Sequence, residues 1–114
     1  MLYNLEERTA VFGENIIEFC TTIKQDIITK SLIDQLVRSA TSIGANYMEA
    51  NSASSRRDFQ NKIYICKKEA QETKHWLRML SKLLPQKTEE LRRFWLEAQE
   101  LTMIFQKITS SLKK

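Results

Sequence analysis

The segment FQNKIYICKKEAQETKHWLRMLSKLLP, residues 59–85, carries the strongest helical pattern in the chain and sets its architecture. Its seam positions recur at alternating spacings of four and three, the heptad pattern of a packed helix. These positions are Phe59, Ile63, Cys66, Ala70, Thr73, Leu77, Leu80 and Leu84. We expect Thr73, the polar member, to donate its hydroxyl to a backbone carbonyl. Ser55 with Asp58 resembles a cap at the start, and Pro85 ends the helix because it lacks an N–H donor.

A second long helix follows the proline turn. Thr88, Glu89 and Glu90 suit a helix N-terminus, where the helix dipole favours acidic side chains. Its apolar seam again alternates by three and four, at Leu91, Phe94, Ala98, Leu101, Phe105, Ile108 and Leu112. Each of the two predicted helices has roughly 25 residues and is about 40 Å long. A turn this short makes the two helices antiparallel neighbours.

Two earlier helices complete the pattern. We predict them over residues 6–22 and 32–51, with residues 24–30 as their connection. Ser31 followed by Asp34 resembles a capping box at the start of the second helix. Their apolar stripes are Phe12, Ile16, Phe19 and Ile23 in the first, and Leu32, Leu36, Ala40, Ile43 and Tyr47 in the second.

Glycine and proline are scarce, with two glycines and one proline among 114 residues. Sandwiches and barrels need a turn every 8–12 residues or so, and Rossmann folds and P-loops need clustered glycines, so these folds are excluded. The length suits one domain over residues 1–114, with about two-thirds of its unfolded surface buried. The sequence therefore predicts an all-α protein with the architecture of an antiparallel up-down-up-down four-helix bundle.

Ala40 and Gly44 are small residues four positions apart inside the second helix. A glycine there costs roughly 1 kcal/mol relative to alanine, so we expect another helix to approach closely. Asn46, Tyr47 and Glu49 could form a polar site, but packing and hydrogen bonding between helices or subunits account for them more simply. Trp76 and other large apolar residues lie beside the seams, namely Met79, Leu83, Trp95, Met103 and Ile104. A small monomer covers little apolar area, so we predict self-association and assign Ala40, Gly44, Tyr47 and Trp76 to helix or subunit packing.

Charge is distributed unevenly along the chain. Residues 1–54 hold four basic and seven acidic side chains, whereas residues 56–87 hold nine basic and three acidic ones. On the third helix, basic residues at offsets of 0, 7, 11 and 15 share one face. The candidate nucleic-acid-binding set is Lys67, Lys74, Arg78 and Lys82, with Arg56 and Arg57 at the helix start. This set could contact RNA or DNA phosphates, although a solvated polar face explains the same pattern.

No catalytic, metal or cofactor site is predicted. Glu72 and His75 have the Glu-x-x-His spacing of di-iron bundles, but His75 is the single histidine and both residues lie off the inward seam. No arginine stands four to six residues before His75, the pairing usual in small helical ribonucleases, and no nucleophile–base pair is evident. Cys20 and Cys66, far apart in sequence, are expected to be buried thiols.

A membrane location is not expected. The longest unbroken apolar run has four residues, 63–66, whereas a membrane-spanning helix needs about 20. The first seven residues, MLYNLEE, show neither a basic start nor the apolar core of a signal peptide. We therefore expect a cytoplasmic protein without a membrane partner.

Two blocks of the sequence resemble a known bacterial family. The first is RSATSIGANYMEA, residues 38–50. The second comprises Asp58-Phe59, Lys62, Lys68-Glu69-Ala70, Glu72-Thr73 and Trp76-Leu77, in matching order and spacing. Together they resemble the four-helix bundle proteins encoded in intervening sequences of bacterial 23S ribosomal RNA genes.

The resemblance implies properties that residue patterns alone do not show. Members of the family are small four-helix bundles that assemble into ring-like homopentamers. Related proteins are accessory factors to the reverse transcriptases of retroelements, where a basic pentamer engages nucleic acid and the polymerase. No catalytic activity is established for the family, so the resemblance implies a non-enzymatic role.

The predicted function is therefore that of a homo-oligomer, a pentamer by resemblance, that binds nucleic acid or serves a ribonucleoprotein through the basic face of its third helix. The expected partners are copies of the chain itself, RNA or DNA, and a reverse transcriptase or another protein. A structural or protein-binding scaffold without nucleic-acid affinity is the alternative.

Overall fold

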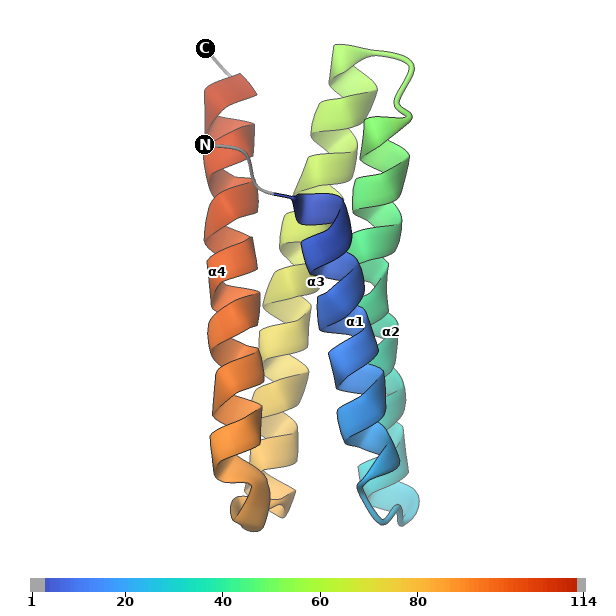
Figure 1. The fold of residues 1–114 in the computed structure, drawn as a ribbon, viewed down its shortest axis with the longest axis vertical. Helices are drawn as coiled ribbons and strands as arrows, with labels where there is room; N and C mark the ends of the chain where they lie inside the picture. The colour runs from blue at the N-terminus through green and yellow to red at the C-terminus, as the bar shows by residue number, and fades with distance from the viewer. Residues whose placement is uncertain (1–3, 113–114) are drawn as a thin grey trace.

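The computed structural model describes residues 4–112, which form four α-helices (Figure 1). The helices are α1 (Leu5–Thr21), α2 (Ile27–Asn51), α3 (Arg56–Leu83) and α4 (Thr88–Leu112), with a 3-10 turn, η1 (Pro85–Lys87), before α4. The described residues contain no strand, so the predicted all-α class with four helices is confirmed. Over the same residues, no helix is both long and apolar enough to span a membrane.

Consecutive helices point in opposite directions along the long axis of the molecule (Figure 1). The colour runs down α1, up α2, down α3 and up α4, so each connection joins neighbouring helix ends. α2 packs against α1 and α3, and α3 packs against α4, whereas the backbones of α1 and α4 lie farther apart and meet mainly through long side chains. The molecule is elongated and measures 45 × 22 × 20 Å. Each helix has buried residues on the face toward its neighbours and exposed residues on the face toward solvent.

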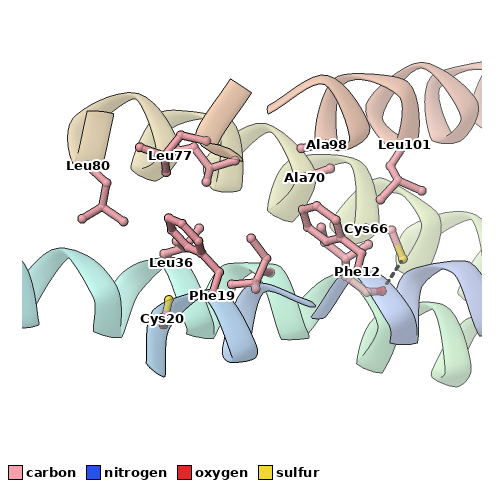
Figure 2. Packing of buried hydrophobic residues seen from close by; sticks show 14 of the residues in the cluster. Phe12, Phe19, Cys20, Leu36, Cys66, Ala70, Leu77, Leu80, Ala98 and Leu101 are labelled. Carbon is pink, nitrogen blue, oxygen red and sulfur yellow. Dashed lines mark hydrogen bonds between the residues drawn. The ribbon is translucent and has the colours of Figure 1, made fainter. Parts of the chain in front are cut away.

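The predicted seams form the core, part of which is drawn in Figure 2. On α3, every seam position from Ile63 to Leu84 is buried, and Phe59 is half-buried. Thr73 donates its hydroxyl to the carbonyl of Glu69 at 2.8 Å, as predicted, so its polar group is satisfied in the core. The α4 seam adds Leu91, Ala98, Leu101 and Phe105 to the same cluster. The heptad pattern thus identified the buried faces of both helices.

α2 begins at Ile27 rather than near Leu32. Asp26 caps the helix by accepting the backbone N–H of Thr29 at 2.8 Å, and this hydrogen bond lowers the pKa of Asp26. Ser31 lies inside the helix, so the capping box predicted there, and the long connection before it, are wrong. The physical reason is that buried Thr29 extends the packed stripe toward the N-terminus, and tertiary packing stabilises the longer helix.

The other predicted boundaries agree with the structure. At the start of α3, the hydroxyl oxygen of Ser55 accepts the backbone N–H of Asp58 at 3.0 Å. α3 ends at Leu83, and Pro85 begins η1. Thr88 follows as the first residue of α4, so η1 supplies the tight turn between α3 and α4.

α1 and α2 cross closely at their small residues. A Cβ atom added to Gly44 would lie 3.2 Å from the hydroxyl oxygen of Thr9 on α1. A Cβ atom added to Gly13 would lie 3.5 Å from the Cγ2 atom of Thr41 on α2. Each glycine therefore faces the opposite helix, and Ala40 is fully buried on the same stretch of α2. The absent side chain of Gly44 is what lets α1 approach.

Candidate nucleic-acid interface

Two of the predicted basic residues reach from α3 to amide side chains of α4. The ammonium of Lys67 donates a hydrogen bond to Gln106, and that of Lys74 donates to Gln99. Arg78, one turn beyond Lys74, lines a pocket shared by the two helices. We call this surface the α3–α4 edge, formed by Lys67, Lys74 and Arg78 from α3 and by Gln99 and Gln106 from α4.

The remaining three predicted residues lie near the ends of α3. Arg56 donates from Nη2 to the carbonyl oxygen of Leu112 at 3.1 Å, which ties the start of α3 to the end of α4. Arg57 and Lys82 are exposed at opposite ends of α3. The structure thus joins Lys67 and Lys74 to α4 and places Arg78 beside the adjoining pocket. Arg56 also reaches α4, and Lys82 lies one turn beyond Arg78.

The predicted basic residues carry unneutralised charge. Among the ion pairs of residues 4–112, none involves Lys67, Lys74, Arg78, Lys82, Arg56 or Arg57. The α2 side of α3 differs, because Lys62 pairs with Glu49 at 2.7 Å and Arg38 pairs with both Glu69 and Glu72. Charge pairing therefore separates two faces of the same helix.

The sequence of α4 explains why the α3–α4 edge keeps its charge. α4 turns the uncharged amides of Gln99 and Gln106 toward α3. Its carboxylates Glu97 and Glu100 instead hold Arg8 of α1, at 2.8 and 2.9 Å. The helix therefore presents acidic groups to α1 and neutral groups to α3.

A pocket lies on the α3–α4 edge beside η1. It encloses about 390 Å³ and is lined by Leu77, Arg78, Ser81, Thr88, Leu91, Arg92, Trp95 and Leu96. Arg92 was not among the residues identified from the sequence. It stands three residues before Trp95 and seven before Gln99, so it shares their side of α4, and this spacing was the available signal.

Apolar surface accompanies the charge on this part of α4. The ammonium of Lys74 lies 5.1 Å from the centroid of the Trp95 ring, a cation–π contact. Trp95 itself is 37% exposed, and Leu96 and Met103 are 53% and 60% exposed. The edge thus combines free cations, amides and an accessible aromatic ring.

The four residues predicted for helix or subunit packing have neighbours inside the bundle. Ala40 and Gly44 lie on the face of α2 that meets α1 and the core. The ring centroids of Tyr47 and Phe105 are 6.1 Å apart. Trp76 is half-buried and donates its indole N–H to a glutamate one turn earlier, at 3.0 Å. All four therefore have packing contacts within the chain itself.

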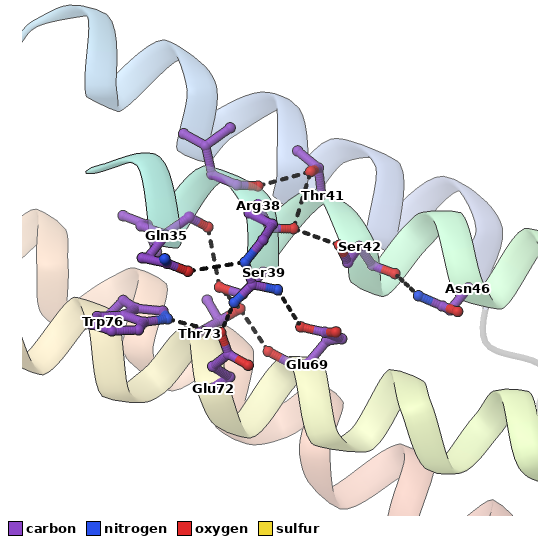
Figure 3. Close-up of polar contacts among 12 residues, drawn as sticks. Gln35, Arg38, Ser39, Thr41, Ser42, Asn46, Glu69, Glu72, Thr73 and Trp76 are labelled. Atoms are coloured by element: carbon purple, nitrogen blue, oxygen red, sulfur yellow. Dashed lines mark hydrogen bonds and ion pairs between the residues drawn. The ribbon is translucent and has the colours of Figure 1, made fainter. Parts of the chain in front are cut away.

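A polar cluster joins α2 to α3 (Figure 3). Arg38 of α2 reaches Glu69 at 3.4 Å and also contacts Glu72. The hydroxyls of Ser39 and Thr73 are hydrogen bonded at 3.0 Å in the core below. These five residues come from the two sequence blocks that carry the family resemblance, so the motif packs two helices together at this interface.

Glu72 and His75, which have the Glu-x-x-His spacing, both contact other side chains. Glu72 is engaged by Arg38 and by the indole N–H of Trp76. His75 is exposed, with its ring edge-on to Trp76 at 4.8 Å between centroids. Within residues 4–112, no group of three or more His, Cys, Asp and Glu side chains is placed to hold a metal ion.

Both cysteines are buried free thiols, as predicted. Burial raises the pKa of Cys20 to about 11 and that of Cys66 to about 12. Since the thiolate is the nucleophilic form, neither thiol is activated for chemistry near neutral pH.

A larger cleft of about 640 Å³ separates α1 from α4. Its apolar lining includes Phe12, Phe19 and Phe94, and its polar lining includes Arg8, Glu18, Glu90, Arg93 and Glu97. Hydrogen bonding to Glu97 raises the pKa of Arg8 further above its usual range. The guanidinium of Arg8 is thus already paired with carboxylates of α4. The carboxylates disfavour phosphate, so this cleft is not a candidate for nucleic-acid binding.

The sequence matches the family model of the 23S rRNA-intervening sequence protein over residues 4–107. The fold is similar to a crystal structure of a protein with unknown function from the S23 ribosomal protein family of Bacteroides thetaiotaomicron, with a TM-score of 0.82. The two chains are 30% identical, and the match covers 92% of this chain and 97% of that one. No curated protein matches the sequence.

Proposed function

Because the chain belongs to the 23S rRNA-intervening sequence protein family, as its two sequence blocks predicted, we propose that it is a non-catalytic, homo-oligomeric module that binds RNA or DNA. The α3–α4 edge would contact the phosphates. The observation that supports this function is that Lys67, Lys74 and Arg78 share one edge without a carboxylate partner within residues 4–112. Cations that are not already neutralised gain most from a polyanion, because binding releases its condensed counterions.

A phosphate group can replace the amide partners of the two lysines. Gln99 and Gln106 accept hydrogen bonds from Lys74 and Lys67 without neutralising them. A phosphate oxygen offers the same acceptor with a negative charge, and charge-assisted hydrogen bonds are the stronger ones. The lysines are therefore oriented along the edge before a ligand arrives.

Exposed apolar side chains support the oligomeric part of the proposal. Leu83 and Met103 are 41% and 60% exposed on α3 and α4, and neither lines the pocket beside η1. Ile104, which the sequence placed beside the seam, is 7% exposed and belongs to the core instead. Covering the exposed side chains with a second copy would stabilise an assembly, and a pentameric ring would repeat the α3–α4 edge around one particle.

Light scattering of the purified protein tests assembly directly. We expect a particle mass near five times 13.4 kDa that persists at high salt, because apolar contacts are not screened. A monomer at micromolar concentration would contradict the oligomeric proposal.

A protein-binding or structural scaffold is the second candidate, and the same exposed apolar side chains support it. Its partner would be a protein, such as the reverse transcriptase that the family resemblance suggests. The genomic neighbourhood separates these settings, since an adjacent reverse-transcriptase gene favours the protein partner and a surrounding ribosomal RNA gene favours the intervening-sequence setting. A scaffold of this kind would remain assembled but show no affinity for nucleic acid near physiological salt.

Charge reversal tests the α3–α4 edge. The double variant Lys74→Glu with Arg78→Glu should bind a generic RNA at least about tenfold more weakly, with a salt dependence reduced by about one per lost contact. The matched control is Lys24→Glu with Arg93→Glu, which changes net charge equally but lies on other surfaces. Equal affinity and equal salt slope in the two variants would refute the proposed edge.

A further inference from the structure

The pocket beside η1 has a chemistry that phosphate binding alone does not explain. Arg78 and Arg92 approach it from α3 and α4, and neither guanidinium has an ion-pair partner within residues 4–112. Trp95 lines the same pocket and leaves 37% of its surface exposed. The lining contains no carboxylate, unlike that of the α1–α4 cleft.

These groups match the parts of a nucleotide. Guanidinium groups bind phosphate through paired, planar N–H donors. An indole ring offers a stacking surface that any base can use, and such stacking tolerates all sequences. At about 390 Å³, the pocket falls within the size range of small-ligand sites, about 300–1,000 Å³.

Lys74 contacts the Trp95 ring without lining the pocket. Its ammonium lies 5.1 Å from the Trp95 ring centroid, but Lys74 is not among the residues that line the pocket. Leu77, Leu91 and Leu96 supply apolar walls beside the ring. A base could therefore enter without displacing the cation that already contacts Trp95.

We propose that this pocket binds one nucleotide of a single-stranded RNA or DNA, with its base against the indole of Trp95 and a phosphate between Arg78 and Arg92. A base in a duplex is paired and stacked, so it cannot fill the pocket without first being extruded. The inference rests on the proposed function, because the adjoining phosphates would follow the α3–α4 edge toward Lys74 and Lys67. It adds a preference for unpaired strands that a basic surface alone does not have.

Binding of two probes tests this pocket, a short oligothymidylate and a DNA duplex with the same number of phosphates. Fluorescence anisotropy over a range of salt concentrations gives their affinities and salt slopes. Trp95→Leu should weaken binding of the oligothymidylate about tenfold and leave binding of the duplex unchanged. Arg92→Gln should lower the salt slope for the oligothymidylate by about 0.7. Arg93→Gln is the matched control, because its side chain lines the α1–α4 cleft, and it should change neither.

Two further measurements keep the test decisive if Trp95→Leu fails to fold. Trp95→Phe retains an aromatic ring and should keep most of the preference for the oligothymidylate. In a Trp76→Phe background, Trp95 is the remaining tryptophan, and its fluorescence should fall when the oligothymidylate binds. Unchanged fluorescence upon saturating binding would refute the contact.

The outcomes separate this inference from the function on which it rests. One outcome is that the wild type binds both probes and Trp95→Leu has the same ratio of oligothymidylate to duplex affinity as the wild type. In that case the nucleotide pocket is wrong and the α3–α4 edge stands. If the wild type binds neither probe near physiological salt, both proposals are wrong. If only the oligothymidylate loses affinity in Trp95→Leu, the pocket is supported.

Discussion

At the scale of single residues, the contact between Gly44 and Thr9 determines how near α1 comes to α2. Replacing Gly44 by leucine should destabilise the fold, because even a Cβ atom there lies 3.2 Å from the Thr9 hydroxyl and 3.5 Å from its carbonyl carbon. Overpacking of this kind costs about 1–3 kcal/mol. Urea denaturation of Gly44→Leu measures the change. Ala45→Leu, at the exposed neighbouring position, is the control, and a Gly44→Leu variant as stable as the control would contradict the crossing.

The two buried thiols predict an alkaline limit to stability. Burial raises the pKa of Cys20 to about 11 and that of Cys66 to about 12, whereas unfolded thiols ionise near about 8.5. The unfolded chain therefore loses these protons first as the pH rises. The stability that each thiol contributes is intact below about pH 8.5 and falls above it, by up to about 1.4 kcal/mol per pH unit.

Chemical denaturation at about pH 8 and about pH 10 measures this loss. Cys66→Val removes the titrating group from the core position, so its stability should fall less between the two pH values than that of the wild type. An equal fall in both proteins would assign the alkaline sensitivity to other groups.

At the scale of helices, the start of α2 gives a test between two candidate caps. Asp26→Ala removes the carboxylate that accepts the Thr29 N–H at 2.8 Å, and should lower the free energy of unfolding by about 1 kcal/mol. Ser31→Ala, at the cap favoured by sequence, should leave stability unchanged or slightly higher, because Ser31 lies exposed inside the helix. Thermal unfolding compares the two variants. A larger loss of stability in Ser31→Ala than in Asp26→Ala would contradict the start at Ile27 and favour the later start of α2.

The buried faces of α3 and α4 were predictable from the sequence, whereas the first residue of α2 was not. The heptads of α3 and α4 repeat over many turns, so their buried faces were predictable from spacing alone. The start of α2 was not, since Ile27 and Ile28 are 91% and 64% exposed and interrupt the pattern that buried Thr29 continues. A local cap signature at Ser31 could not be weighed against packing that appears only in the folded chain.

At the scale of the whole molecule, the candidate interface was only partly predictable. The shared face of Lys67, Lys74 and Arg78 follows from their spacing on one helix. The contributions of Arg92 and Trp95 depend on the axial and rotational alignment of α4 relative to α3. The residue pattern of a single helix carries no information about that alignment. For the same reason, the sequence marked Gly44 as a packing site but could not identify Thr9 as its partner.

The sparse contact between α1 and α4 has a consequence for motion. α1 is held along α2, while Arg8 and the ring of Phe94, 5.3 Å from Phe19, connect it to α4 across the cleft. A helix supported mainly on one side can detach without unfolding the α2–α3–α4 core. Amide hydrogens of α1 should therefore exchange with deuterated solvent faster than those of α3 in native-state exchange measurements. Uniform protection of both helices would show that the chain opens only as one cooperative unit.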